Sequence, residues 1–363
     1  MGFSCGIIGL PNVGKSTIFN ALSSAGAEVA NYPFCTIDPN KGIVAVPDER
    51  LDKLAELIKP KKKIPTTLEF WDVAGLVKGA SKGEGLGNRF LGHIRNVDAL
   101  IHVVRCFEDE NIAHVNGPVN PKNDVDIIKT ELIIADLEII EKRIEKLSRL
   151  KKVGAKGTDE ELSLLKKIQN ILYEGKNPKA LLNGDKDLKQ IKELNLLSLK
   201  PVLYVANIDE KELKEKKFVK EIKEIADKDG TKLVTIVGKL EAEIAELPFE
   251  DRDIFLKEMG ITESGLKQII KEGYALLRLI TFYTTVNQQL RAWTIPEGTP
   301  APIAAGKIHS DMERGFIKAE VITFNDFIKC GSEFAAKEKG LLKIEGKEYI
   351  IKDGDIIHFR FNV

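Results

Sequence analysis

The stretch GLPNVGKS, residues 9–16, decides the fold class of this chain. It matches the pattern G-x-x-x-x-G-K-[ST], whose glycines let the backbone curl so that several N–H groups point at one phosphate. The apolar run from Cys5 to Ile8 predicts a buried strand before it, and the residues from Thr17 to Leu22 predict a helix after it. A phosphate-binding loop between a strand and a helix indicates an α/β fold with a P-loop nucleotide-binding domain.

Each residue type in this loop suits a triphosphate and a divalent metal ion. Lys15 is expected to reach the β- and γ-phosphates and so to assist catalysis, and Ser16 is expected to ligate Mg²⁺. The following helix adds the partial positive charge of its N-terminus. An ordinary glycine turn with an exposed lysine is the alternative interpretation. The nucleotide-binding residues predicted in this stretch are Asn12, Val13, Gly14, Lys15, Ser16 and Thr17.

The composition, 43% hydrophobic and 30% charged over 363 residues, is that of a soluble globular protein with two or three domains. No apolar run approaches the ~20 residues that cross a bilayer, and the strand expected near residue 5 argues against a signal peptide, so no membrane partner is expected. The four cysteines form no C-x-x-C pair, which argues against structural zinc and favours the reducing cytoplasm. The formal net charge of zero gives no argument for nucleic acid, so any such contact must come from local patches.

Two further segments supply candidates for the metal and the γ-phosphate. The residues from Thr66 to Trp71 predict a strand that ends at Asp72, whose carboxylate is a candidate ligand of Mg²⁺. Gly75, three residues on, is expected to place its N–H against the γ-phosphate and to respond to its loss. The proline-containing loop 30–40 presents Thr36, which is either another hydroxyl ligand of Mg²⁺ or an ordinary turn stabiliser.

The residues that would act on water differ from those of many small GTPases. Those proteins carry Gln after the glycine of this motif, whereas this chain has Leu76, which can neither donate nor accept a hydrogen bond. Either hydrolysis is slow or another group orients the water. His114, in the loop after the apolar strand 99–107, is the candidate for this catalytic role, and a solvated loop histidine is the alternative. The glycine-rich stretch 75–92 predicts a switch or, alternatively, a flexible surface loop.

Between residues 126 and 200 the pattern changes to that of an inserted helical hairpin. Apolar residues recur every three or four positions from Ile133 to Leu147 and again from Leu162 to Leu172, and glycines separate the two runs. The first run carries a basic face within residues 142–152. This face either contacts RNA or is a solvated surface paired with neighbouring glutamates.

The choice of base is expected to be decided where the apolar strand 201–206 ends. Guanine-specific relatives of this fold carry Asn-Lys-x-Asp there, and the Asp accepts hydrogen bonds from guanine N1–H and N2–H₂. This chain keeps Asn207 but has Ile208 in place of the Lys and Glu210 in place of the Asp, which predicts relaxed or switched base choice. Asn207 can still address N7 or the 6-substituent of a base, and the backbone at Gly238 is expected to cover it.

The last part of the chain predicts a separate small domain. A helix is expected over 265–281, and from residue 282 to 363 short strand patterns predict a β-grasp domain. The nucleotide-binding domain then comprises residues 1–125 and 201–281, with 126–200 as its insertion. Four residues are candidates for a binding face on the small domain, with a neutral surface as the alternative: His309, Arg314, Lys318 and Arg360.

The chain resembles the YchF family, the Obg-like ATPases, in several segments taken together. They are the loop 9–16, residues 72–75, the run ASKGEGLGN at 80–88, residues 207–210 and the ending HFRFNV at 358–363. The resemblance runs along essentially the whole chain. It implies a P-loop G domain, an inserted helical hairpin and a C-terminal TGS domain of the β-grasp type. It also implies Mg²⁺-dependent hydrolysis of ATP in preference to GTP, and association with the ribosome in the cytoplasm. Members of the wider class that lack the Gln often use a monovalent cation such as K⁺ near the loop's asparagine, here Asn12.

We therefore expect a nucleotide-switched ATPase in which ATP orders the loops around Thr36 and Gly75. An Obg-type GTPase is the first alternative. The second is a non-enzymatic adaptor that binds RNA or the ribosome, through the helical insertion and the TGS domain, and holds nucleotide only as a structural ligand. One position departs from the resemblance, because relatives often carry Ser-Ala in the base-covering loop where this chain has Val237-Gly238.

Overall fold

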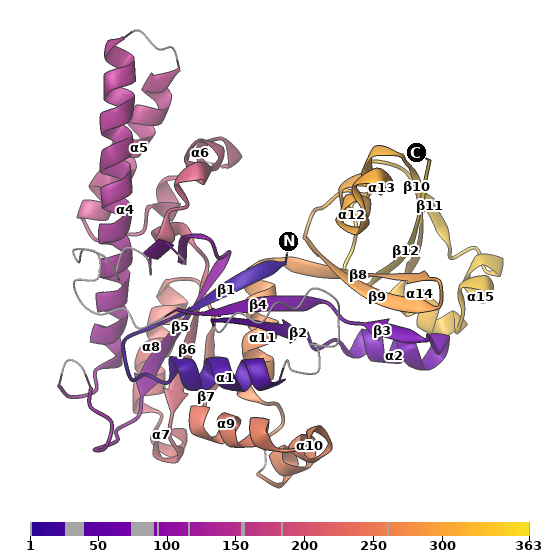
Figure 1. The fold of residues 1–363 in the computed structure, drawn as a ribbon, viewed down its shortest axis with the longest axis horizontal. Helices are drawn as coiled ribbons and strands as arrows, with labels where there is room; N and C mark the ends of the chain where they lie inside the picture. The colour runs from indigo at the N-terminus through magenta and orange to yellow at the C-terminus, as the bar shows by residue number, and fades with distance from the viewer. Residues whose placement is uncertain are drawn as a thin grey trace.

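The computed structural model describes residues 2–25, 40–73, 91–92, 94–114, 117–153, 157–182, 184–259 and 261–362. These residues form two β-sheets and a long helical arm (Figure 1). The arm and the second sheet lie on opposite sides of the first sheet. Among the described helices, none has both the length and the apolar character of a membrane span.

The first sheet is mostly parallel and lies between two layers of helices. Its described strands are β1 (Phe3–Ile8), β2 (Lys41–Ala45), β4 (Thr67–Asp72), β5 (Ala99–Cys106), β6 (Val202–Ile208) and β7 (Leu233–Ile236). Their order is β2-β4-β1-β5-β6-β7, and β2 alone among them runs antiparallel to its neighbour. All eight residues of β5 are buried, as expected for a strand that helices cover on both faces.

Helices from distant parts of the chain cover this sheet. α1 and α11 pack together on one face, and α4 with α8 packs on the other. The helices of this domain are α1 (Lys15–Ala25), α7 (Glu210–Glu215), α8 (Lys217–Lys228), α9 (Gly238–Glu246), α10 (Phe249–Glu258) and α11 (Gly265–Leu276). Because the parallel strands all point the same way, the segments 9–16, 107–114 and 207–210 leave the sheet at one edge.

The helical arm consists of two antiparallel helices, which confirms the predicted hairpin. α4 (Pro121–Lys152) has 32 residues, about 48 Å at 1.5 Å per residue, and α5 (Thr158–Tyr173) returns along it. α4 begins five residues before residue 126, the predicted start of the insertion, because Asn120 accepts a hydrogen bond from the N–H of Asn123 and Pro121 occupies the first turn. The arm ends in shorter helices: η2 (Pro178–Leu181), α6 (Asp185–Ile191), η3 (Lys192–Leu194) and η4 (Leu197–Leu199).

The second sheet belongs largely to the C-terminal part of the chain. Its described strands are β3 (Lys62–Ile64), β8 (Leu279–Val286), β9 (Gln289–Pro296), β10 (Phe316–Thr323), β11 (Lys343–Glu345) and β12 (Asp355–Phe361). The order β11-β10-β12-β8-β9-β3 places the last strand in the middle, parallel to β8. With a helix packed on one face, this arrangement confirms the predicted C-terminal β-domain.

Several helices of this domain go beyond the strand patterns that the sequence predicts. They are α12 (Ala301–Ile308), α13 (Ser310–Arg314), α14 (Phe324–Cys330) and α15 (Glu333–Glu338). The expected helix over 265–281 is too long, because Arg278 adopts a positive φ of 49° and β8 begins at Leu279. The C-terminal domain therefore starts slightly before the predicted boundary at residue 282.

A segment from the first half of the chain also joins the second sheet. α2 (Glu49–Ile58) buries Leu51 and Leu54 against side chains of β8, β9 and β12, and β3 pairs in parallel with β9. The sequence analysis assigned all of residues 1–125 to the nucleotide-binding domain. The structure instead places α2 and β3 with the C-terminal domain, because the apolar face of α2 packs against the C-terminal sheet.

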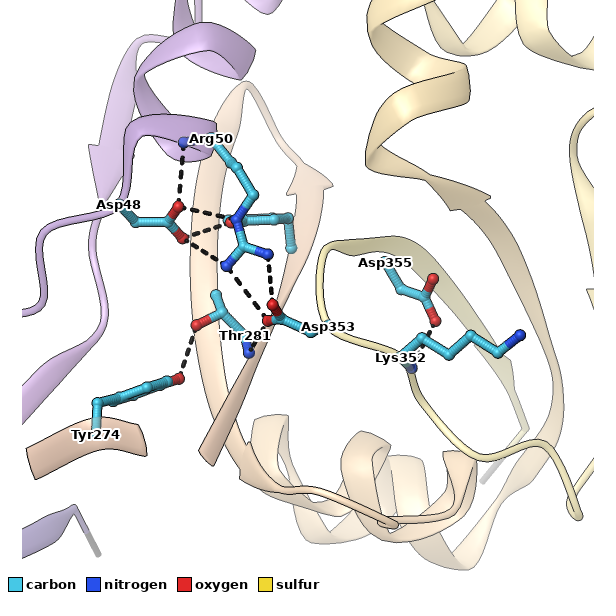
Figure 2. A network of polar contacts seen from close by, with 8 residues as sticks. Asp48, Arg50, Tyr274, Thr281, Lys352, Asp353 and Asp355 are labelled. Carbon is cyan, nitrogen blue, oxygen red and sulfur yellow. Dashed lines mark hydrogen bonds and ion pairs between the residues drawn. The ribbon is translucent and has the colours of Figure 1, made fainter. Parts of the chain in front are cut away.

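Polar contacts reinforce this union of the two domains (Figure 2). The guanidinium of Arg50 donates to Asp48 through Nε at 3.0 Å and to Asp353 through Nη1 at 2.7 Å. Asp353 also accepts from the N–H of Thr281 at 2.9 Å, and the Thr281 hydroxyl lies 2.7 Å from that of Tyr274 on α11. Side chains from the start of α2, from α11 and from the C-terminal domain thus share one partly buried network.

Replacing Arg50 with Ala should loosen α2 from the C-terminal sheet, since Asp48 and Asp353 would lose their common cation. We expect the amide hydrogens of residues 49–58 to exchange about tenfold faster, which corresponds to about 1.4 kcal/mol of local opening free energy. Hydrogen exchange followed by mass spectrometry measures this. Arg149→Ala, which removes an exposed i,i+4 pair with Glu145, is the control and should change nothing there. Equal protection of α2 in the parent and in Arg50→Ala would contradict the role of the network.

Candidate nucleotide-binding site

The loop 9–16 connects β1 to α1 and depends on its two outer glycines. Gly9 has a φ of 151° and Gly14 a φ of 94°, conformations that side chains disfavour. A Cβ atom on Gly9 would lie 2.4 Å from the carbonyl oxygen of Val103, and one on Gly14 would lie 2.3 Å from the amide nitrogen of Asn207. The glycines therefore let the loop approach β5 and β6 closely enough to form a phosphate cradle.

Lys15 lies inside this loop, with only 6% of the residue exposed. Its Nζ donates a hydrogen bond to the carbonyl of Leu10 at 2.7 Å, so the side chain folds back across the loop. Burial lowers the pKa of Lys15 to about 8, and the nearby carboxylate of Asp72 opposes this shift. A buried cation with so little anionic compensation is suited to receive the negative charge of a phosphate.

Ser16 and Asp72 form the candidate metal site. The Ser16 hydroxyl donates to Oδ2 of Asp72 at 3.0 Å, across the gap between α1 and the end of β4. The other carboxylate oxygen, Oδ1, is buried and accepts no hydrogen bond from the residues that the structure describes. A hydroxyl and an unsatisfied carboxylate oxygen side by side are hard oxygen donors, which is the chemistry that Mg²⁺ selects. These two residues therefore fit the ion that the sequence predicts there.

Asn207 ties three segments of the site together. Its Nδ2 donates to the carbonyl of Val13 at 2.9 Å, and its Oδ1 accepts from the N–H of Gly238 at 2.9 Å. Only 6% of the residue is exposed, so this amide is chiefly occupied in joining the phosphate loop to the start of α9. A contact to the base, which the sequence predicts for Asn207, requires the second Nδ2 hydrogen or a second lone pair on Oδ1.

The two altered positions of the base motif lie in different surroundings. Ile208 is buried beneath the sheet edge in a cluster that includes Cys106 and Phe218, so it can meet a nucleotide only through its backbone. Glu210 is the exposed first residue of α7, directly after Asp209, which caps that helix by accepting from the N–H of Glu212. The carboxylate of Glu210 thus projects from a rigid helix start.

The segment at Gly238 is anchored from behind by Glu241, a residue that the sequence analysis did not identify as important. Its carboxylate accepts from the Ser264 hydroxyl at 2.7 Å and from the N–H of Gly265 at 2.5 Å, at the start of α11. Burial raises the pKa of Glu241, and these donors oppose the shift. The only signal in the sequence is one glutamate in an amphipathic helix, which does not distinguish this anchor from a surface residue.

The side chain of His114 is buried rather than solvated, with 5% of it exposed. Its Nε2 lies 2.9 Å from Oδ2 of Asp124 in the first turn of α4. The preceding residue, Ala113, accepts a hydrogen bond at 3.1 Å from the side-chain amide of Asn12 in the phosphate loop. This contact brings the segment of His114 against the loop, although the two are separated by about a hundred residues in the sequence.

Arg105, at the end of β5, holds the loop that leads to His114. Its guanidinium is almost fully buried and donates to the carbonyls of Phe107, Asp109 and Ile112. Burial lowers the pKa of Arg105, and the carboxylates of Asp109 and Asp124 oppose this. The sequence analysis treated this residue as part of an apolar strand, because a single arginine in such a strand does not reveal which carbonyls it will meet.

Comparisons with known proteins agree with this geometry. Residues 4–148 match a family model described as a 50S ribosome-binding GTPase, and residues 279–362 match a C-terminal YchF model described as a protein of unknown function. The chain is 52% identical to the ribosome-binding ATPases YchF of Bacillus subtilis and of Escherichia coli O157:H7, in both cases over all of both chains. The chain belongs to the YchF family.

A solved YchF structure supports the same assignment. The YchF GTPase of Schizosaccharomyces pombe is 39% identical, with a TM-score of 0.87 over 99% of this chain and 98% of that one. The relatives are thus named both for ATP and for GTP. The base that this YchF chain prefers must therefore be argued from its own residues.

The remaining candidates of this YchF chain are placed as follows. Thr36 and Gly75 lie outside the described residues. Val13 is buried and offers its carbonyl to Asn207, whereas Thr17 is exposed in the first turn of α1. Apart from Thr36 and Gly75, the predicted site residues meet at one edge of the first sheet, which is where a P-loop domain binds its nucleotide.

The basic candidates on the two outer parts of the chain are largely paired. On the C-terminal sheet, Arg360 and Lys318 both contact Glu320, and on α13 of the same domain Arg314 pairs with Asp311. On the arm, three cations of the predicted basic face pair with acidic residues: Arg143 with Glu161, Arg149 with Glu145 and Lys151 with Asp159. These pairs favour the alternative of solvated, charge-balanced faces over a strongly basic RNA surface.

Replacing Asn207 with Ala should weaken nucleotide binding about tenfold, because the Val13 carbonyl and the Gly238 N–H would both lose their partner and the loops around the nucleotide would separate. Isothermal titration calorimetry measures the affinity. Asn177→Ala is the matched control, since that amide donates to the carbonyl of Ser198 at the base of the arm. Unchanged nucleotide affinity in Asn207→Ala would show that the tie does not organise the site.

Proposed function

We propose that this protein is a cytoplasmic, ribosome-associated ATPase that works as a nucleotide-dependent switch. The observation that carries the proposal is the buried Lys15 beside the Ser16–Asp72 pair, at the end of a glycine loop that opens toward the sheet edge. The relatives at 52% identity carry the name ribosome-binding ATPase. Their full-length match supports the same activity and the same partner here.

Hydrolysis would rest mainly on positioning and charge neutralisation. Lys15 would exchange its bond to the Leu10 carbonyl for oxygens of the β- and γ-phosphates, while the N–H groups of the loop and of the first turn of α1 hold the phosphate chain. Ser16 and Asp72, with Thr36, would hold Mg²⁺, which supplies charge neutralisation at the phosphates when bound. The N–H of Gly75 would register the γ-phosphate.

His114 takes the role that a glutamine has in many small GTPases. Its segment contacts the phosphate loop through Ala113 and Asn12, which supports a role for this histidine on a water near the γ-phosphate. Leu76 carries no polar group that could compete for this task. Asn12 commits its Nδ2 to Ala113, so a monovalent cation such as K⁺ would be met by its Oδ1.

The preference for ATP follows from the carboxylate after β6. A guanine requires an acceptor held in the plane of N1–H and N2–H₂, and Glu210, one methylene longer than Asp, projects from the start of α7. Adenine lacks both of those donors and is served by Asn207 and by the backbone at Ile208 and Gly238. An Obg-type GTPase remains the alternative that this proposal must exclude.

Lys15→Met should abolish hydrolysis, with the rate of phosphate release falling at least a thousandfold, because no other described side chain can place a cation inside the loop. A multiple-turnover phosphate-release assay, with and without ribosomes, measures this. Lys200→Met is the matched control, since Lys200 is also partly buried and donates to a backbone carbonyl, that of Val97, away from the site. Hydrolysis by Lys15→Met at the parent rate would rule out the mechanism and favour the adaptor alternative.

Separate titrations with ATP and GTP test the choice of base. The parent should bind ATP more tightly, and the double variant Ile208→Lys, Glu210→Asp, which restores the guanine motif, should shift the ratio of affinities toward GTP at least tenfold. Isothermal titration calorimetry of both proteins gives the four dissociation constants. Tighter binding of GTP by the parent would overturn the interpretation of Glu210.

A further inference from the structure

The carboxylate of Asp124 is the least satisfied charged group near the site that the mechanism has not used. Only 2% of this residue is exposed, and its Oδ1 is buried and has no hydrogen-bond donor within the described part of the chain. Its Oδ2 lies 2.9 Å from Nε2 of His114. Burial raises the pKa of Asp124, and the interaction with His114 opposes that shift. Among the described residues, the only hydrogen-bond partner of this carboxylate is His114. Burying a carboxylate with so few partners costs folding free energy, which makes the pair a candidate for a functional role.

The surroundings hold this pair in place from two sides. Arg105 fixes the backbone from residue 107 to 112, and Asn12 fixes the next carbonyl, that of Ala113. On the other side, Asp124 belongs to the first turn of α4, whose start Asn120 caps. The imidazole of His114 thus lies between a segment attached to the phosphate loop and the beginning of the helical arm.

We propose that Asp124 is a positioning residue for ATP hydrolysis, which holds His114 by Nε2 and thereby sets the ring's orientation and its tautomer. This inference rests on the proposed ATPase function and on the role given there to His114. With Nε2–H donated to Asp124, Nδ1 is the nitrogen that acts on the attacking water, by the same logic as a carboxylate that orients a catalytic histidine in other hydrolases.

The bond changes of the step are those of ordinary phosphoanhydride hydrolysis. The water oxygen forms a bond to the γ-phosphorus, and the bond from that phosphorus to the β,γ-bridging oxygen breaks, with its electron pair leaving on ADP. Nδ1 of His114 takes one proton of the water and returns it to the phosphate product. Asp124 keeps its negative charge throughout and stabilises the imidazole while it carries the extra proton.

The location of Asp124 gives the arm a direct connection to this step. α4 continues from the first turn for about 48 Å to its far end, so a partner that shifts the start of α4 would also shift the carboxylate that holds His114. A merely structural hydrogen bond at the same place would stabilise the helix without affecting the reaction. The two roles can be separated by kinetics.

Single-turnover hydrolysis of ATP by Asp124→Asn, His114→Ala and the double variant tests the proposal. Asp124→Asn, which keeps the shape of the side chain, should lower the rate about 10- to 100-fold while ATP affinity stays within twofold of the parent. In the His114→Ala background the same change should have no further effect, because the carboxylate acts only through the histidine.

The matched control is Asp136→Asn in the same helix. Asp136 is fully buried, pairs with Arg95 at 3.1 Å and accepts from the N–H groups of Leu197 and Ser198, so its loss tests helix packing without the site. Its hydrolysis rate should remain near that of the parent. Should Asp124→Asn fold poorly by circular dichroism, Asp124→Ser must show the same non-additivity with His114→Ala.

Four results would overturn the proposal. The first is an Asp124→Asn rate equal to or above that of the parent, and the second is a loss of rate on adding Asp124→Asn to His114→Ala as large as the loss in the parent background. The third is an Asp136→Asn rate as low as that of Asp124→Asn, and the fourth is a parent-like rate in His114→Ala. The last result would remove His114 from the mechanism, whereas failure of the ATPase function itself would appear as the insensitivity of hydrolysis to Lys15→Met.

Discussion

The buried amide of Asn207 is the contact on which the nucleotide site depends. A primary amide buried to this degree must satisfy both its ends, and here the nitrogen meets the phosphate loop while the oxygen meets the start of α9. The close approach is possible only because Gly14 has no side chain. One side chain at the end of β6 therefore sets the separation of the two loops between which a nucleotide must lie.

The helical arm is joined to this site by a second set of contacts rather than by a simple linker. Asn12 reaches the carbonyl before His114, and His114 reaches the first turn of α4. Arg105 makes the intervening loop rigid by donating to several of its carbonyls. Since the arm extends away from the sheet in Figure 1, its base is the part that can sense the nucleotide, and its far end is free for a partner.

The sequence predicts the elements with strong local signals and leaves out those that depend on distant partners. The glycine loop, the strand before Asp72 and the apolar repeats of the arm are local patterns, and the structure confirms these elements. Asp124 and Glu241 could not be recognised, because each is a single carboxylate in an amphipathic helix whose partner lies on another element. The sequence likewise leaves open whether His114 is catalytic or a solvated loop histidine, because its burial and its contact with Asp124 depend on a helix that follows later in the chain.

The assignment of α2 shows why domain boundaries are hard to infer from order along the chain. The chain passes from one sheet to the other at residues 46–48, again at 65–66 and again at 277–278, so the two domains share more than one connection. Apolar contacts of Leu51 and Leu54, the pairing of β3 with β9 and the Arg50–Asp353 contact all act across these crossings. A single covalent crossing would permit the C-terminal domain to swing as a body. Here several connections cross between the sheets, and packed or charged side chains reinforce them. A movement of β2 would therefore also move α2 and, through α2, the C-terminal sheet.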